Sequence, residues 1–180
     1  MQPPVPAPPL VRRSRREDLA RLAAIERSAA ALFVGTHAAA FAAGPTTHPR
    51  TLARGHAAGL LWVSEMDGAV AGFLLAEPCP EGLYLRELSV AAAAQRRGHG
   101  RALMRAGIDH ARAAGAAAVL LTTDRTLPWN APFYARLGFR LCTEGDMPAT
   151  LRARLDRQIA EGMDATKRCA MVLPLVNINE

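Results

Sequence analysis

The chain contains few aromatic residues, few cysteines and no long apolar run. Aromatic residues make up 5% of the sequence, and the arginines are scattered rather than interleaved with them, which disfavours a nucleic-acid-binding surface. No stretch approaches the roughly 18 uninterrupted apolar residues that span a bilayer, so we expect no membrane partner. The three cysteines, Cys79, Cys142 and Cys169, form no CxxC motif. That spacing disfavours a disulfide framework or a zinc site and indicates the reducing cytoplasm.

The N-terminal segment lacks the basic and apolar series of a signal peptide and is rich in proline. We expect residues 1–9 to be a disordered tail and residues 10–176 to form one domain. A chain of 180 residues, of which 50% are hydrophobic, suits a single core. The five histidines show no HExxH or other metal-ligand spacing, so we expect no metal.

The charge balance is positive, with 22 Lys and Arg against 16 Asp and Glu, for a formal net charge of +6. Such a charge raises encounter rates with phosphate-bearing partners. Lys167 is the one lysine, and alanine is abundant. A general bias in composition therefore explains the charge better than a specific anionic partner does.

Hydrophobic periodicity predicts an α/β domain with a mixed, mostly antiparallel, twisted sheet flanked by helices. Ser14 and Glu17 have the spacing of a capping box and should begin a helix, and Asp67-Gly68 is typical of a hairpin turn. The expected strands are 10–13, 60–66, 69–76, 83–90, 117–123, 139–142 and 168–175. The expected helices are 14–33, a short one at 50–58, 100–114, 130–137 and 148–161.

The sharpest local feature is the basic, glycine-bearing turn Gln95-Arg96-Arg97-Gly98-His99-Gly100-Arg101, placed between a predicted strand and a predicted helix. Glycines let successive backbone N–H groups point outward, and a helix start adds positive potential, so such a turn suits a phosphate. A Walker loop would need Lys-Ser/Thr after the second glycine, and a dinucleotide fold would need glycine where this chain has Leu103. Both alternatives are excluded.

Two blocks of the sequence resemble the GCN5-related N-acetyltransferase (GNAT) superfamily. Leu88-Ser89-Val90 followed by Gln95-Arg96-Arg97-Gly98-His99-Gly100 is similar to its strand, Gln/Arg-x-x-Gly-x-Gly/Ala turn and helix, although alanine replaces the usual proline at Ala92. The segment from Asn130 to Phe139, with Tyr134 and Gly138, is similar to its second cofactor block, Asn-x-x-x-x-Tyr-x-x-x-Gly-Phe. The resemblance covers roughly residues 10–175.

The resemblance implies a GNAT-type sheet that splays between strands 83–90 and 117–123, and an acetyl-CoA-dependent N-acetyltransferase. Such an enzyme transfers an acetyl group directly to a primary amine in a ternary complex. The alternative is a non-catalytic acyl-CoA-binding sensor or interaction module of the same fold. The implied cofactor-binding residues are Leu88, Ser89, Val90, Gln95, Arg96, Arg97, Gly98, His99, Gly100, Arg101, Asn130 and Tyr134.

The resemblance also implies catalytic candidates. Tyr134 would be the general acid for the departing thiolate, because a phenol with a pKa of about 10 roughly matches a thiol; the alternative is a buried core tyrosine. Glu87 would deprotonate the amine through water, unless it pairs with Arg86 or another arginine. The Val90 N–H is the candidate donor to the thioester oxygen.

The acceptor side is less determined by the sequence. Glu26, Asp124 and Trp129 are the candidate substrate-binding residues, with a solvated helix face, a surface pair with Arg125 and simple packing as their respective alternatives. Asn130 would contact the cofactor or simply cap its helix. The acceptor would be a small-molecule amine or a protein amine, and a homodimer through the last strand or the helix around Leu155 is an open alternative.

Overall fold

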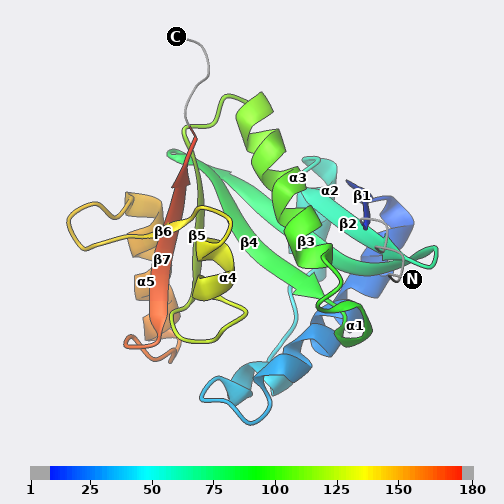
Figure 1. Ribbon diagram of the computed structural model, residues 1–180, viewed down its shortest axis with the longest axis horizontal. Coiled ribbons are helices and arrows are strands. Elements are labelled where there is room, and N and C mark those ends of the chain that lie inside the picture. Colours follow the sequence, from blue (N-terminus) through cyan, green and yellow to red (C-terminus); the bar gives the residue numbers. More distant parts are fainter. Residues whose placement is uncertain (1–8, 176–180) are drawn as a thin grey trace, which may run out of the picture. The chain divides into compact units, whose positions relative to one another are not determined.

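The computed structural model of the protein describes residues 9–175 (Figure 1). The predicted disordered tail, apart from Pro9, and the predicted domain end at residue 176 lie outside the described residues. Seven strands form one sheet in the order β1-β2-β3-β4-β5-β7-β6. The strands are β1 (Leu10–Arg13), β2 (Leu61–Met66), β3 (Ala69–Cys79), β4 (Gly82–Val90), β5 (Ala118–Asp124), β6 (Arg140–Leu141) and β7 (Arg168–Pro174). The α-helices are α1 (Leu19–Ala29), α2 (Pro49–Ala57), α3 (His99–Ala113), α4 (Ala131–Ala135) and α5 (Ala149–Ala160).

The expected mixed, mostly antiparallel α/β sheet is confirmed. β1 with β2, β2 with β3, β5 with β7 and β6 with β7 are antiparallel pairs, whereas β4 and β5 run parallel. The parallel register joins Leu83 to Val119 and Tyr84 to Leu120; the splay further along these strands stays a prediction. Among residues 9–175, no helix is both long and apolar enough to cross a membrane.

The chain divides into two compact units. The first runs to Ala76 and includes Glu87–Gly107, and the second comprises Glu77–Arg86 and the chain from Ile108 onward. β3, β4 and α3 each continue from one unit into the other.

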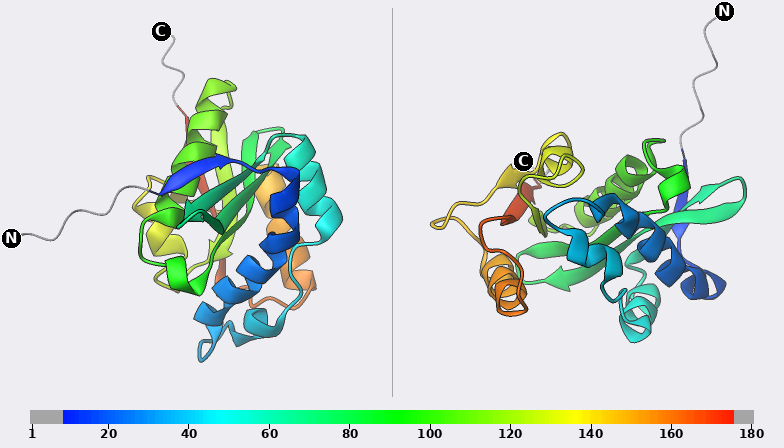
Figure 2. Two further views of the ribbon diagram at one scale, coloured as in Figure 1. Left: turned by 90° about the vertical axis from the view of Figure 1, so that its right-hand side faces the viewer. Right: turned by 90° about the horizontal axis from the view of Figure 1, so that it is seen from below.

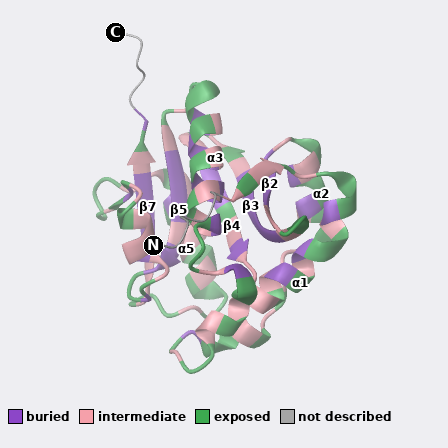
Figure 3. Cartoon of the chain, turned by 45° about the vertical axis from the view of Figure 1, so that its right-hand side comes forward, coloured by how far each residue is buried: buried purple, intermediate pink, exposed green. Residues whose placement is uncertain are grey.

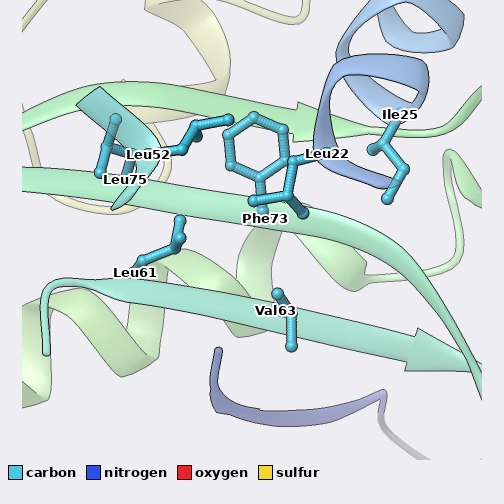
Figure 4. Packing of buried hydrophobic residues seen from close by; sticks show 7 residues of the cluster. All are labelled: Leu22, Ile25, Leu52, Leu61, Val63, Phe73 and Leu75. Atoms are coloured by element: carbon cyan, nitrogen blue, oxygen red, sulfur yellow. The ribbon is translucent and has the colours of Figure 1, made fainter. Parts of the chain in front are cut away.

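The first unit has its core between a hairpin and two helices. Asp67 and Gly68, with φ angles of 52° and 77°, form the tight turn between β2 and β3. Alternate residues of the two strands face α1 and α2, which lie on the same side of the hairpin, whereas the start of α3 lies on the other side (Figure 2). The buried cluster consists of Leu22, Ile25, Leu52, Leu61, Val63, Phe73 and Leu75 (Figure 4).

The second unit has a separate core on the face that β4, β5 and β7 turn toward α5. The buried residues of this cluster are Tyr84, Leu120, Leu151, Ala170 and Val172. β5 and β7 are buried over most of their length (Figure 3), as expected for the continuous apolar run of β5. All three cysteines are free thiols. Burial raises the pKa of Cys169 in β7 to about 11, and its Sγ lies 3.7 Å from the Thr123 carbonyl oxygen.

The start of α1 differs from the expected capping box. Ser14 Oγ lies 2.8 Å from His56 Nδ1 and does not begin the helix. Instead, Asp18 accepts the Arg15 N–H at 2.6 Å and pairs with Arg12 at 2.7 Å. Both contacts favour the ionised carboxylate, so the pKa of Asp18 is lowered by its hydrogen bond with Arg12, against the opposing effect of burial. The prediction was wrong about which residues cap this turn, although an acidic side chain still accepts a backbone N–H there.

Candidate functional site

The turn between β4 and α3 has an unusual backbone. Arg96 and Gly98 both have left-handed conformations, with φ angles of 60° and 88°. Positive φ is uncommon for a residue other than glycine, so its presence at Arg96 makes this turn a candidate functional site. Left-handed residues in a short turn make successive N–H groups converge on one concave point, which is a recurrent anion-binding arrangement. The side chains of Arg96, Arg97 and Arg101 are exposed around it.

The first helical turn adds further donors. The Ala102 N–H bonds the Gly98 carbonyl at 3.0 Å, which is the first hydrogen bond of α3. The N–H groups of His99, Gly100 and Arg101 therefore precede the regular ladder and have no partner within the helix. Because of the helix dipole, they present positive potential at this end. This geometry agrees with the phosphate-binding role predicted for residues 95–101.

Two side chains hold the turn in place. Gln95 Nε2 donates to the Val90 carbonyl at 3.0 Å, which ties the beginning of the turn to the end of β4. His99 Nδ1 lies 3.0 Å from Ser64 Oγ on β2, and His99 and Ser64 are only 4% and 0% exposed. Burial, reinforced by the charge of Arg97, lowers the pKa of His99. The sequence does not indicate this contact, because Ser64 is distant from the turn along the chain.

The end of β4 has a backbone N–H donor on the edge that faces away from β3. The Ala91 N–H bonds the Ala71 carbonyl at 2.8 Å, so it is directed toward β3. Successive N–H groups of a strand point to opposite edges, and the Val90 N–H therefore points away from β3. This direction agrees with the expectation that Val90 donates to a ligand. Leu88 and Val90 are half-buried, whereas Ser89 is buried.

Glu87 has a hydroxyl partner on the same strand. Ser89 Oγ donates to Glu87 Oε1 at 2.7 Å, which fixes one carboxylate oxygen. Arg86 Nη1 pairs with Glu77 Oε1 at 2.9 Å, and the alternative that Glu87 pairs with Arg86 or another arginine stays a prediction. Glu87 is half-buried.

Tyr134 and Asn130 lie at α4, in the second unit. The Tyr134 ring is half-buried and makes edge-to-face contacts with Phe133 and Phe139, whose ring centroids lie 5.2 and 6.0 Å away. Asn130 occupies the N-cap position, but its side chain makes no capping hydrogen bond; its carbonyl oxygen accepts the N–H groups of Phe133 and Tyr134. The simple-cap alternative for the Asn130 side chain is therefore wrong.

The three substrate-binding candidates have local partners or are partly covered. Glu26 is half-buried, not solvated, and accepts the Thr47 N–H and hydroxyl at 2.9 to 3.1 Å. Asp124 is buried, and its Oδ1 accepts from the Thr126 N–H and hydroxyl and from the Leu127 N–H. The alternative, a surface pair with Arg125, is thus wrong, because Asp124 is only 3% exposed. Trp129 is half-buried.

The candidate residues are distributed over both units. The set from Leu88 to Arg101, with Glu87 and Glu26, belongs to the first unit, and Asp124, Trp129, Asn130 and Tyr134 belong to the second. Within the described part of the chain, no three His, Cys, Asp or Glu side chains gather in a way that could hold a metal ion.

Comparison with known proteins gives a consistent result. The sequence model of the acetyltransferase (GNAT) family matches residues 26–139. Among solved structures, N-acetylglutamate synthase from Neisseria gonorrhoeae, complexed with coenzyme A and N-acetyl-glutamate, is 21% identical with a TM-score of 0.70. The match covers 95% of this chain but 36% of the synthase, so the chain spans about a third of that protein.

Two further structures match most of their own length. The ribosomal-protein-S18-alanine N-acetyltransferase from Escherichia coli is 22% identical with a TM-score of 0.67, and the match covers 96% of this chain and 98% of that one. A GNAT family acetyltransferase from Brucella melitensis, in complex with acetyl-CoA, is 25% identical with a TM-score of 0.55, over 78% and 91% of the two chains.

Proposed function

Because the chain belongs to the acetyltransferase (GNAT) family, we propose that it is an acetyl-CoA-dependent N-acetyltransferase that moves an acetyl group directly onto a primary amine in a ternary complex. The observation that carries the proposal is the turn from Gln95 to Arg101, where two left-handed residues precede the first turn of α3. This is an arrangement that binds a pyrophosphate through backbone N–H groups.

The donor would be held by the first unit's residues. The N–H groups from Arg96 to Arg101 would bond the pyrophosphate oxygens, and the arginine side chains would add charge. A Cβ built at Gly98 meets only the Pro9 ring within 4 Å, so the turn leaves room for a ligand beside it. The pantetheine arm would lie along the edge of β4 toward which the Val90 N–H points, as an added strand.

Acetyl-CoA, when bound, supplies the thioester carbonyl that an amine attacks. The Val90 N–H would donate to the carbonyl oxygen as negative charge develops there. Tyr134 Oη would give its proton to the departing sulfur. Glu87 would accept the proton of the amine through a water molecule, with Ser89 Oγ holding its Oε1 in a fixed position.

Calorimetric titration with acetyl-CoA tests the donor site, with free CoA and ATP as controls. Micromolar binding should be lost in Gly98→Ala, because a Cβ at a φ of 88° distorts the turn. Gly115→Ala is the matched control, since Gly115 also has a positive φ, of 69°, with nothing within 4 Å of a built Cβ. Equal binding by both variants, or absence of binding by the folded wild type, would overturn the proposal.

Tyr134→Phe tests turnover separately from binding. Loss of a general acid should reduce kcat by roughly a hundredfold or more, with unchanged affinity for acetyl-CoA. A screen of primary amines with and without a carboxylate would provide the acceptor for this assay. Acetyl-CoA binding without acetylation of any amine would favour the sensor alternative instead.

A further inference from the structure

A chain of four polar side chains runs beneath α5 in the second unit. Tyr84 Oη lies 2.9 Å from Thr122 Oγ1, and Gln158 Nε2 donates to the same Thr122 oxygen at 3.0 Å. Arg168 Nε and Nη2 both donate to Gln158 Oε1, at 3.2 and 2.9 Å. We call these residues the α5 polar chain. It joins β4, β5, α5 and β7 and ends at a guanidinium.

The hydrogen bonds fix which edge of that guanidinium is used. Gln158 gives its amide N–H to Thr122, so its oxygen faces Arg168. That oxygen takes the edge formed by Nε and Nη2. The opposite edge, formed by Nη1 and the second N–H of Nη2, has no hydrogen-bond acceptor among the described residues. Two parallel N–H groups at this edge match the two oxygens of a carboxylate.

Arg168 also differs from two other arginines of this unit, Arg154 and Arg86, which form ion pairs. Arg154 pairs with Glu77 Oε2 at 2.6 Å and lies over the Tyr84 ring, and Arg86 pairs with the other oxygen of Glu77. Arg168 is half-buried and takes part in none of the ion pairs within residues 9–175. Burial lowers its pKa, and the neighbouring ionisable groups oppose this only in part. A half-buried cation without an ion-pair partner is costly unless a ligand compensates it.

We propose that the edge of Arg168 formed by Nη1 and Nη2 binds a carboxylate of the acceptor. The substrate is then an amine that also carries a carboxylate, such as an amino acid. The inference rests on the proposed function and specifies its substrate class. Asp124, opposite Arg168 in the β5–β7 ladder, supplies one nearby negative charge, which favours a monoanion over a phosphate dianion. Tyr134, the candidate acid, belongs to the same unit as Arg168.

Matched ligand pairs test the proposal directly. Each L-amino acid and its C-terminal amide would be titrated into the protein by calorimetry in the presence of CoA, and acetylation rates would be measured for the same pairs. For at least one side chain, the carboxylate member should bind roughly ten- to a hundredfold more tightly than the amide, as a charge-assisted bidentate contact provides. The phosphate-bearing amine phosphoethanolamine provides a third arm.

Three variants separate recognition from folding. Arg168→Met should abolish the preference for the carboxylate. Arg157→Gln, which removes an exposed charge from α5, the helix that carries Gln158, should keep it. Gln158→Glu places a carboxylate of the same shape against the guanidinium. It should also abolish the preference while the protein stays folded and keeps Arg168. A purely structural role for Arg168 predicts no change in ligand preference in Gln158→Glu.

The outcomes distinguish this inference from the proposed function. If the wild type binds acetyl-CoA but binds both members of every pair equally, or prefers phosphoethanolamine, the carboxylate site is overturned and the donor site remains. A carboxylate preference retained in Gln158→Glu would also overturn it. If acetyl-CoA does not bind, the proposed function fails, while the ligand pairs still report on Arg168 through their own titrations.

Discussion

His99 illustrates how much one side chain can contribute beneath a ligand-binding turn. Its backbone belongs to the predicted phosphate site, and its imidazole is buried against Ser64 on β2. The ring therefore anchors the first turn of α3 to the hairpin. A neutral imidazole suits this place, because burial and the adjacent Arg97 both lower its pKa.

The lowered pKa of His99 predicts a pH-dependent stability. The unfolded chain takes up a proton near pH 6.5, whereas the folded chain resists it, so stability should fall as pH drops from about 6.5 through the folded-state pKa. Urea unfolding between pH 8 and pH 5 would measure this. His99→Gln, which can still bond Ser64, should have a flatter profile over the same range. Identical profiles would show that His99 does not titrate as expected.

Glu26 has a structural role that its position in the helix does not indicate. Its carboxylate holds the segment that precedes α2 through three contacts with Thr47. Glu26→Ala should cost about 1–3 kcal/mol of folding free energy and should speed hydrogen exchange at the Thr47 amide. Glu17→Ala, at an exposed position just before α1, is the control. Unchanged hydrogen exchange at the Thr47 amide would contradict this structural role of Glu26.

At the scale of elements, α2 depends on a close approach to β3. A Cβ built at Gly55 would clash with Leu75 Cδ1, and Leu75 is nearly completely buried. Gly55→Ala should therefore destabilise the protein by about 1–3 kcal/mol, although alanine favours helix formation. Leu75→Val in the same chain should restore part of this loss. Thermal unfolding of the single and double variants would measure both effects, and a more stable single variant would contradict the packing argument.

Elements with strong local patterns were predictable from the sequence. The hairpin at Asp67-Gly68 and the helices α3 and α5 follow from turn chemistry and periodicity, and the succession of strands along the chain follows from the apolar runs. The left-handed Arg96 was not predictable, because arginine has no preference for positive φ. Partners far apart in sequence, such as Ser64 with His99 or Gln158 with Arg168, depend on register and packing, which a single sequence does not specify.

At the scale of the whole molecule, two separate cores support one continuous sheet. Leu22 and Leu151 are both fully buried, one in each unit's cluster. Leu22→Ala and Leu151→Ala should each cost about 2–5 kcal/mol. Hydrogen exchange should quicken first in β2 and α1 for Leu22→Ala, and in β5, β7 and α5 for Leu151→Ala. The same pattern in both variants would show that the two units open together.

The labelling rate of Cys169 should report on how often the sheet opens around it. Its thiol is buried in β7, and its pKa of about 11 leaves little thiolate at neutral pH, whereas Cys79 and Cys142 are partly exposed. A thiol-specific reagent should therefore label two sites quickly and the third at the rate at which the ladder between β5 and β7 separates. Mass spectrometry of the third label, with and without an acceptor amino acid, would report how strongly the ligand holds that ladder closed.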